Sequence, residues 1–223
     1  IKNNMSKLRC LARLLNDNKL IKAKNDEYGI EGRNYSPKKS KALFAIDTSK
    51  CTDKYVKLSL EGQELFGLRR EESMKFILSE ALQYDKIVLK PSWTKGGIGR
   101  TIAITSARQW EWIRKVQCIT KPGQALIPLE ISYKKQLHRY IHQTRTMGLK
   151  NLHGLRHAYA QRRYKELTTF YDKAKIGWEC PFMGGAKHSE MTSEHKDIDI
   201  KVRNILVRDL GHSRLNILKT YLG

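Results

Sequence analysis

The sequence predicts a mainly α-helical fold that carries one small antiparallel β-sheet. Apolar residues recur at helical spacing along most of the 223 residues, and an apolar content of 40% is enough to form a core. One region differs, because the short apolar runs 87–89 and 101–104 lie on either side of a turn with two glycines, which is typical of a β-hairpin. The chain has no internal repeat and no low-complexity segment. We therefore expect an α+β fold in which helices dominate.

Two parts are expected, residues 1–40 and residues 41–223. Residues 1–34 have the pattern of a helix and a turn with one apolar stripe, and a lone helix cannot bury such a stripe. We therefore interpret this part as the end of a small helical domain whose beginning is missing. Residues 34–41 are polar, basic and contain a proline, which suits a linker.

In the second part, helical periodicity is interrupted by glycines and capping residues. Gly67 and Gly148 each follow an apolar helical pattern and are expected to end a helix. Ser106 and Gln109 form a capping box. A long loop is expected from 177 to 194, and helices are expected at 52–66, 68–83, 106–118, 130–147, 153–167 and 197–210.

The closing stretch places a histidine nine residues before a tyrosine. Gly211 is expected to stop the preceding helix and Ser213 to cap a short final one. Tyr221 would then lie on a face next to a buried stripe formed by Leu215, Leu218 and Leu222. A tyrosine at this position usually serves packing alone, so a functional role depends on what other residues accompany it.

The balance of charge indicates a polyanionic partner. Lysine and arginine total 43 against 22 acidic residues, which gives a formal net charge of +21 and a pI of about 9.9. The basic residues are spread through both halves, so the folded surface is expected to be positive, most often a sign of nucleic-acid binding. The alternative is a basic protein kept soluble by its charge.

The cysteines favour free thiols in a reducing cytoplasm. The four of them lie far apart with no CxxC pair, and Cys180 with His188 and His195 has irregular spacing for zinc. No apolar run approaches the roughly 20 residues of a membrane helix, and no signal-peptide pattern is present. We expect a cytoplasmic protein that has no contact with a membrane.

Three short motifs could bind a phosphate. Arg69 and Glu72 are three residues apart at a helix start, so the carboxylate can orient the guanidinium. Lys95 lies at the tip of the predicted hairpin. His153 and Arg156, followed by a second histidine, share one helix face. Each motif alone has an ordinary interpretation as exposed surface residues.

The order of these motifs resembles the active-site series of tyrosine recombinases. The resemblance extends over about residues 45–223 and includes the sequences around Arg69, around His153 and from Leu210 to the end. Segments 92–97 and 177–185 are similar, more narrowly, to phage-type integrases of integrative conjugative elements. The resemblance implies a catalytic domain at 41–223, preceded in 1–40 by the C-terminal part of a helical core-binding domain.

The resemblance also implies roles for individual residues. The catalytic set would be Arg69, Lys95, His153, Arg156, His212 and Tyr221, supported by Glu72 and His157. The tyrosine would attack a DNA phosphate and form a 3′-phosphotyrosine link, with the arginines and His212 as phosphate ligands. His153 would assist the tyrosine, and Lys95 would protonate the leaving 5′-hydroxyl. Further DNA contacts are expected from Lys38, Lys39, Lys41, Arg70 and Arg100.

This chemistry fits general requirements for cleaving a phosphodiester. A pentacoordinate, doubly charged transition state needs several positive donors around it when no metal is used. A phenol, whose ordinary pKa is about 10, needs help to lose its proton. The interpretation implies no metal, cofactor or ATP. It implies double-stranded attachment-site DNA as partner, a homotetramer on DNA, and possibly a directionality factor.

Two other interpretations stay open from the sequence. A DNA-binding accessory protein without catalysis would carry the same charge, and a type IB topoisomerase would use similar chemistry. A zinc protein is a more distant alternative. Formation of a covalent DNA adduct separates catalysis from binding, and joining to a second duplex separates a recombinase from a topoisomerase.

Overall fold

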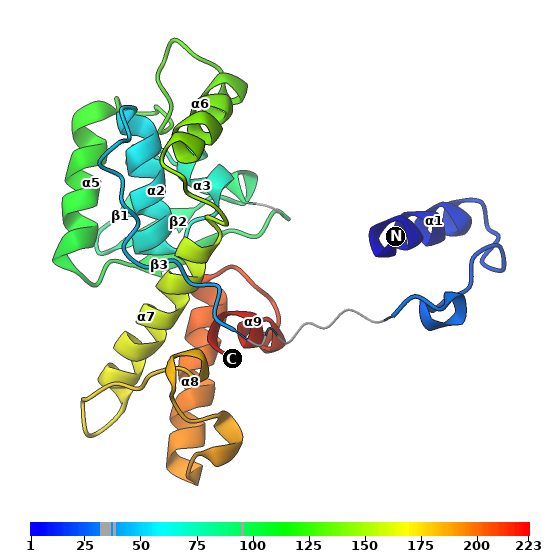
Figure 1. Ribbon diagram of the computed structural model, residues 1–223. Helices are drawn as coiled ribbons and strands as arrows, with labels where there is room; N and C mark the ends of the chain where they lie inside the picture. Colours follow the sequence, from blue (N-terminus) through cyan, green and yellow to red (C-terminus); the bar gives the residue numbers. More distant parts are fainter. Residues whose placement is uncertain (32–36, 38, 95) are drawn as a thin grey trace. The chain divides into compact units, whose positions relative to one another are not determined.

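The computed structural model describes residues 1–31, 37, 39–94 and 96–223 (Figure 1). Contacts within the chain divide it into two units, Ile1–Ser36 and Pro37–Gly223. Lys38 and Lys95, which the sequence analysis placed among the functional residues, lie outside the described residues. The interpretation of the first unit as part of a core-binding domain stays a prediction.

The first unit consists of a helix and a short turn of 3-10 helix, α1 (Lys2–Leu14) and η1 (Asp26–Tyr28). The segment between them folds back on α1, since Arg9 Nε donates a hydrogen bond of 2.8 Å to the carbonyl of Lys22. Ala12 is buried, but much of the apolar stripe stays exposed, at Leu8, Leu11, Leu14, Leu15 and Leu20.

The second unit is mainly helical and contains a three-stranded antiparallel sheet. Its α-helices are α2 (Lys54–Phe66), α3 (Arg70–Lys75), α4 (Leu78–Ala81), α5 (Ala107–Ile119), α6 (Tyr133–Thr146), α7 (Gly154–Tyr171), α8 (Ser193–Asp209) and α9 (Lys219–Leu222). Its strands are β1 (Leu82–Gln83), β2 (Lys86–Leu89) and β3 (Arg100–Ala103). Turns of 3-10 helix lie at η2 (Pro91–Trp93), η3 (Pro181–Met183), η4 (His188–Glu190) and η5 (Leu215–Leu218). The predicted fold class, mainly α with a small antiparallel sheet, is confirmed.

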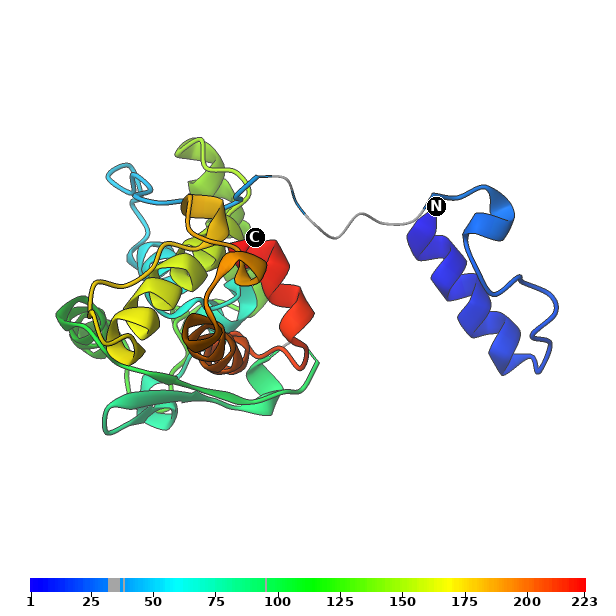
Figure 2. The same cartoon turned by 90° about the horizontal axis from the view of Figure 1, so that it is seen from below.

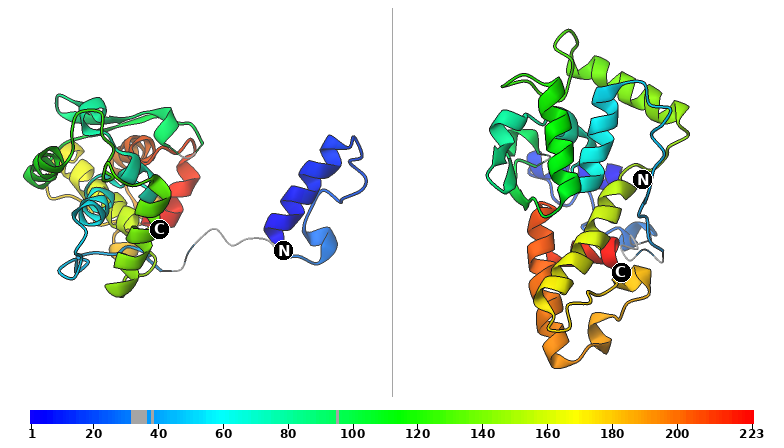
Figure 3. Two further views of the ribbon diagram at one scale, coloured as in Figure 1. Left: turned by 90° about the horizontal axis from the view of Figure 1, so that it is seen from above. Right: turned by 90° about the vertical axis from the view of Figure 1, so that its left-hand side faces the viewer.

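Helix α7 is the centre of the second unit. It packs against α2, α8 and α9, and most of its side chains on all sides are buried (Figure 1). Helices α2 and α5 lie side by side, as the right panel of Figure 3 shows, and Trp112 of α5 stacks near Phe66 and Phe76 at 5.2 and 5.3 Å. The aromatic cluster therefore joins α5 to the segments that lead into and out of α3.

The predicted β-hairpin is confirmed. Strands β2 and β3 pair antiparallel, with Leu89 opposite Arg100 and Lys86 opposite Ala103. Figure 2 shows this ribbon along one side of the unit, next to α8, which packs on β3. Strand β1 was not expected, because two residues are too few to produce an alternating pattern.

The predicted helix 68–83 is wrong, because the structure divides it into α3 and α4. Phe76 is extended (φ −62°, ψ 122°), and its carbonyl accepts a hydrogen bond of 2.9 Å from the Leu126 amide. Ile77 forms a β-bridge with Ala125. The pairing partner lies about 50 residues away, so helical spacing in the segment itself gave no sign of the break.

Other helices begin or end away from the predicted residues. The start of α8 is Ser193 rather than 197, because the Thr192 hydroxyl accepts a hydrogen bond from the His195 amide at 3.3 Å. The start of α6 is Tyr133 rather than 130, where Ser132 supplies the cap, and α7 continues to Tyr171 rather than 167. The loop expected at 177–194 contains η3 and η4. The capping box of Ser106 and Gln109 is present as predicted.

The closing stretch differs from the prediction in two details. Gly211 has a φ of +59° and ends α8 as expected, but no side chain caps η5, which follows Arg214. Leu215 is 40% exposed, whereas Leu218 and Leu222 are buried. Leu215 is the first residue of η5, and the buried part of the stripe is formed by Leu218 and Leu222.

Within the part of the chain that the structure describes, no helix has both the length and the apolar character needed to cross a membrane.

Candidate active site

The hydroxyl group of Tyr221 is contacted by the turn after α8, nine residues before it, and by the start of α7, which is far away in the sequence. Its oxygen lies 3.4 Å from Arg156 Nε, 3.2 Å from His212 Nε2 and 3.4 Å from His153 Nε2. The ring of His157 stacks on the Tyr221 ring at 4.4 Å. The start of α7, the turn after α8 and the helix α9 are thus brought together around one oxygen atom.

The start of α7 is positioned by a close approach of the chain. The amide of Leu43 donates a hydrogen bond of 2.9 Å to the carbonyl of Gly154. A Cβ atom at Gly154 would lie 2.6 Å from Leu43 Cγ and 2.5 Å from the carbonyl oxygen of Lys41. Glycine between His153 and Leu155 therefore lets residues 41–43 pass over the helix start.

Arg156 is buried, with 1% of its surface exposed. Its Nη1 donates to the carbonyl of Gly67 and its Nη2 to the carbonyl of Leu210. These residues follow the last turns of α2 and α8, where carbonyl groups lack helical partners and the helix dipole is negative. Burial lowers the pKa of Arg156 to about 10, so the group is still charged at neutral pH.

Glu72 joins two arginines. Its Oε1 accepts hydrogen bonds from Arg69 Nη1 at 2.6 Å and Arg100 Nη1 at 2.8 Å. Its Oε2 accepts from the Arg69 amide and from Arg100 Nη2, both at 2.6 Å. Burial alone would raise the pKa of Glu72, but hydrogen bonds and charge from Arg100 and Arg69 lower it to about 2. The carboxylate is therefore ionised wherever the protein is folded near neutral pH.

The predicted DNA contact by Arg100 is wrong. Its side chain is 2% exposed and both of its Nη atoms are directed at Glu72, so it cannot lie on a DNA-binding surface. The side chain of Arg69, by contrast, is 22% exposed, and its Nη2 has only a long contact of 3.5 Å with the Leu210 carbonyl. Lys39, Lys41 and Arg70 are exposed and could contact DNA.

The histidines around Tyr221 favour the neutral form. Burial, reinforced by Arg156 and Arg69, lowers the pKa of His212 to about 4 and also lowers the pKa of His153. Burial lowers the pKa of His157 to about 4, and the positive charges of His153 and Lys41 contribute to this shift. At neutral pH each imidazole can therefore donate one hydrogen bond and accept one, or take up a proton from a neighbour.

A groove of about 670 Å³ borders the site on one side. Arg69, Arg70 and His153 line it together with Ile141 and Thr144 of α6 and with Asn151. Glu71 and Glu72 line it as well, and Glu72 is paired with Arg69 and Arg100. The groove thus brings two arginines to the side of the site where His153 lies.

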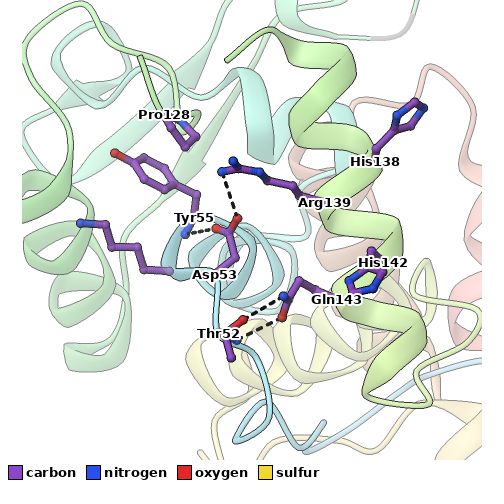
Figure 4. A pocket seen from close by; sticks show the side chains of 9 residues that line it. Thr52, Asp53, Tyr55, Pro128, His138, Arg139, His142 and Gln143 are labelled. Atoms are coloured by element: carbon purple, nitrogen blue, oxygen red, sulfur yellow. Dashed lines mark hydrogen bonds and ion pairs between the residues drawn. The ribbon is translucent and has the colours of Figure 1, made fainter. Parts of the chain in front are cut away.

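A second pocket, of about 700 Å³, lies between the start of α2 and α6 (Figure 4). Gln143 and Thr52 exchange hydrogen bonds of 2.9 and 3.0 Å, and Arg139 points toward Asp53, with Nη1 3.9 Å from Oδ2 (Figure 4). No residue that contacts Tyr221 lines this pocket. Its contacts hold α6 against α2, which positions the wall of the groove described above.

Among the described residues, no three histidine, cysteine or acidic side chains are grouped so that they could hold a metal ion.

The sequence analysis missed the carbonyl groups that hold Arg156. A backbone contact leaves no residue-type pattern, so Gly67 and Leu210 could not be recognised directly. An indirect signal exists, because the glycines at 67 and 211 mark the ends of α2 and α8, where free carbonyls are expected. The role of Arg100 was also missed, since nothing in a local pattern pairs it with Glu72.

The structure is similar to that of the XerH site-specific recombinase in a post-cleavage complex with palindromic difH substrate, with a TM-score of 0.50 and 16% sequence identity. The match covers 91% of this chain and 52% of that one, so the chain spans about half the length of XerH. No protein of curated function matches the chain. Its second unit has the fold of a tyrosine recombinase catalytic domain.

A family model described as integrase matches residues 31–162, more than half of the chain. The chain therefore belongs to the integrase family.

Proposed function

We propose that this chain is the catalytic part of a site-specific recombinase that cuts and rejoins DNA through Tyr221. One observation supports this above all others: the Tyr221 hydroxyl lies within 3.4 Å of Arg156, His212 and His153. A buried tyrosine that served packing alone would not need an arginine and two histidines around its oxygen. The integrase family and the groove beside Arg69 agree with a DNA substrate.

The proposed reaction begins when a DNA phosphate enters beside the hydroxyl. Arg69 holds a non-bridging oxygen, Arg156 acts through the Nε–H group that lies 3.4 Å from the Tyr221 hydroxyl, and His212 donates a further hydrogen bond. His153 takes the proton of Tyr221 as the bond from its oxygen to phosphorus forms. The bond from phosphorus to the 5′-oxygen breaks, and Lys95, which lies outside the described residues, protonates the leaving 5′-hydroxyl.

The covalent 3′-phosphotyrosine link conserves the energy of the broken bond. Attack by the 5′-hydroxyl of a partner strand releases Tyr221 and completes strand exchange without ATP. Glu72 and His157 support this chemistry by holding Arg69 and the tyrosine ring, as their contacts indicate.

We further propose that the enzyme integrates or excises a mobile element. Segments 92–97 and 177–185, which resemble those of integrases from integrative conjugative elements, support this role. Attachment-site duplexes would be the substrates, bound by a homotetramer, with a directionality factor possible. XerH, of similar fold, was crystallised on a DNA substrate.

A nicked suicide duplex tests the proposal, because cleavage releases a short strand and traps the covalent adduct. Duplexes that carry candidate attachment sites are incubated with the protein and separated on a denaturing gel. The wild type should give a protein–DNA adduct, and Tyr221→Phe should bind DNA but give none. Tyr84→Phe, a change at a tyrosine that is 93% exposed, serves as the matched control and should cleave normally.

Other outcomes separate the alternatives. Binding by the wild type without any adduct would indicate a DNA-binding accessory protein. Relaxation of supercoils without joining to a second duplex would indicate a topoisomerase. An adduct formed by Tyr221→Phe would exclude Tyr221 as the nucleophile.

A further inference from the structure

Arg100 is a fully buried arginine that touches two parts of the candidate active site without entering it. It is the first residue of β3, opposite Leu89 in the sheet, and its side chain is 2% exposed. The two Nη atoms bind the two oxygens of Glu72 in a bidentate arrangement, at 2.8 and 2.6 Å. A guanidinium in this arrangement fixes the plane of a carboxylate, which an ammonium group cannot do.

The fixed carboxylate in turn holds Arg69. Each oxygen of Glu72 accepts one hydrogen bond from Arg100 and one from Arg69, so both arginines share both acceptor atoms. Glu72 and Arg69 belong to the same helix start, and the other contact of the Arg69 side chain, from Nη2 to the Leu210 carbonyl, is long at 3.5 Å. Arg100 comes from a strand of the sheet and ties that pair to a separate element.

The same side chain also lies beneath the turn that carries His212. A Cβ atom at Gly211 would be 3.0 Å from Arg100 Cδ and 3.3 Å from its Nη1. Gly211 has a φ of +59° and directly precedes His212, whose Nε2 is 3.2 Å from the Tyr221 hydroxyl. Arg100 therefore supports a second group of the site by packing, in addition to Arg69.

We propose that Arg100 is a positioning residue for DNA cleavage, which holds Glu72 so that the guanidinium of Arg69 is fixed toward the scissile phosphate. The inference rests on the proposed function, and it assigns to Arg100 a role that involves no contact with DNA. The competing explanation is a buried ion pair that only stabilises the fold.

The first experiment measures single-turnover cleavage of the nicked duplex by Arg100→Met and Arg100→Lys. Loss of an outer residue that orients an active-site group lowers activity roughly 10- to 100-fold. We expect a loss in this range for both variants, with the dissociation constant for DNA changed less than about threefold, because Arg100 does not touch DNA. Arg100→Lys keeps the buried charge and carries the test if Arg100→Met does not fold.

Arg203→Met is the matched control. Arg203 is also a mostly buried arginine, with 14% of its side chain exposed, and its Nε binds both oxygens of the buried Asp199. It should lower the melting temperature as much as Arg100→Met but leave the cleavage rate of the folded protein unchanged. Equal cleavage losses in the two variants, or normal cleavage by Arg100→Lys, would overturn the inference.

A double-mutant cycle separates positioning from general stabilisation. If Arg100 acts through Arg69, its removal should cost little once Arg69 is gone. We expect Arg100→Lys to lower cleavage less than about threefold in an Arg69→Ala background. A full 10- to 100-fold loss in that background would show that Arg100 does not act through Arg69.

A measurement without DNA keeps the inference separate from the proposed function. NMR relaxation of the arginine Nε–Hε groups reports side-chain order on the ps–ns timescale. Arg69 should be ordered in the wild type and in Arg203→Met but mobile in Arg100→Lys. If the wild type forms no covalent adduct, the proposed function fails, but this measurement still decides whether Arg100 holds Arg69. If the side-chain order of Arg69 is the same in Arg100→Lys as in the wild type, the inference is overturned.

Discussion

The guanidinium group of Arg156 has three different partners on three of its nitrogen atoms. Two are carbonyls at the ends of α2 and α8, and the third is the hydroxyl of Tyr221. A lysine at this position could not reproduce this arrangement, since its three N–H donors all leave one nitrogen atom, whereas the three partners of Arg156 are bound by three different nitrogen atoms. The residue therefore holds two helix ends, and in the proposed reaction it would also stabilise charge at the tyrosine.

Arg156→Lys should accordingly lose cleavage while it keeps DNA binding. A donor of this kind is worth about 3 kcal/mol in the transition state, so the cleavage rate should fall on the order of 100-fold. Single-turnover cleavage and DNA-binding titrations measure the two effects. Equal losses in cleavage and in DNA binding would instead indicate that Arg156 only anchors a phosphate. Thermal unfolding of the variant shows whether it is folded.

The histidines around Tyr221 make a second prediction, which concerns stability against pH. The folded pKa of His157, about 4, lies below its ordinary value of 6.5, so in this window the unfolded chain binds more protons than the folded one. Stability should therefore fall as the pH is lowered through 6.5 toward 4. His157→Phe keeps a ring against Tyr221 but removes the titrating group, and should weaken this pH dependence.

Urea unfolding between pH 7 and pH 5 measures the effect. Protonation of Glu72 has little effect in this range. Its pKa of about 2 in the folded protein means that its contribution to the free energy of unfolding is lost at more acidic pH. An identical slope of stability against pH in His157→Phe and in the wild type would contradict the prediction. His212 and His153, whose pKa values are also lowered, should contribute to the remaining slope in the same direction, whereas Asp209 and Glu61, whose pKa values are raised by burial, should oppose it.

At the scale of single elements, the end of α2 shows how a turn builds the site. Gly67 has a φ of +60°, and a Cβ atom there would overlap the ring of Tyr159. The same turn directs the Gly67 carbonyl at Arg156 and leads at once into Arg69. One glycine thus sets the directions of both arginines of the candidate site.

Gly67→Ala should be destabilised by about 3 kcal/mol, from left-handed backbone strain together with the overlap with Tyr159. Gly148→Ala is the matched control, since Gly148 has a φ of +69° but open space around it. Strain alone should cost it about 1 kcal/mol. Urea unfolding of both variants measures the difference, and equal destabilisation would show that the contact with Tyr159 has no effect.

The elements also show which features a sequence can predict. Some features depend on local chemistry, and the sequence predicts them correctly. These are the glycines at 67 and 211, the hairpin, and the capping box at Ser106. The break between α3 and α4 depends on Ala125 and Leu126, which lie far along the chain. Arg100 was misassigned for the same reason, because its partner Glu72 is 28 residues away. Local patterns predict caps and turns, whereas pairing between distant segments requires the fold.

The candidate site depends on both kinds of information. Motif order predicted that His153, Arg156, His212 and Tyr221 would meet, and their atoms lie within 3.4 Å of one oxygen. Their roles in cleavage stay predictions until the suicide-substrate experiment is done. Arg69 is held beside the site by Glu72, which lies buried between Arg69 and Arg100. The two arginines keep the Glu72 carboxylate ionised and in place.

At the scale of the whole molecule, the net charge of +21 predicts steep dependence of DNA binding on salt. Lysine and arginine side chains that neutralise phosphates release counterions, so affinity falls as salt rises. A protein with about six phosphate contacts loses roughly 1,000-fold in affinity between about 50 and 200 mM salt. We expect a loss of this size for the wild type, measured by fluorescence anisotropy with a labelled attachment-site duplex.

The location of the contacts can be tested in the same assay. Lys39 and Lys41 are both exposed. The charge of Lys41 helps to lower the pKa values of His153 and His157, so Lys41 lies near the site. Lys39 is two residues away from it in the chain. Replacing both with alanine should reduce the slope of log affinity against log salt by about 2. Lys165 and Lys173, on or just beyond the last turns of α7, are paired with Glu179 and Glu194, and their double replacement should leave the slope unchanged. If the two double variants changed the slope equally, binding would depend on overall charge and not on the surface around Tyr221.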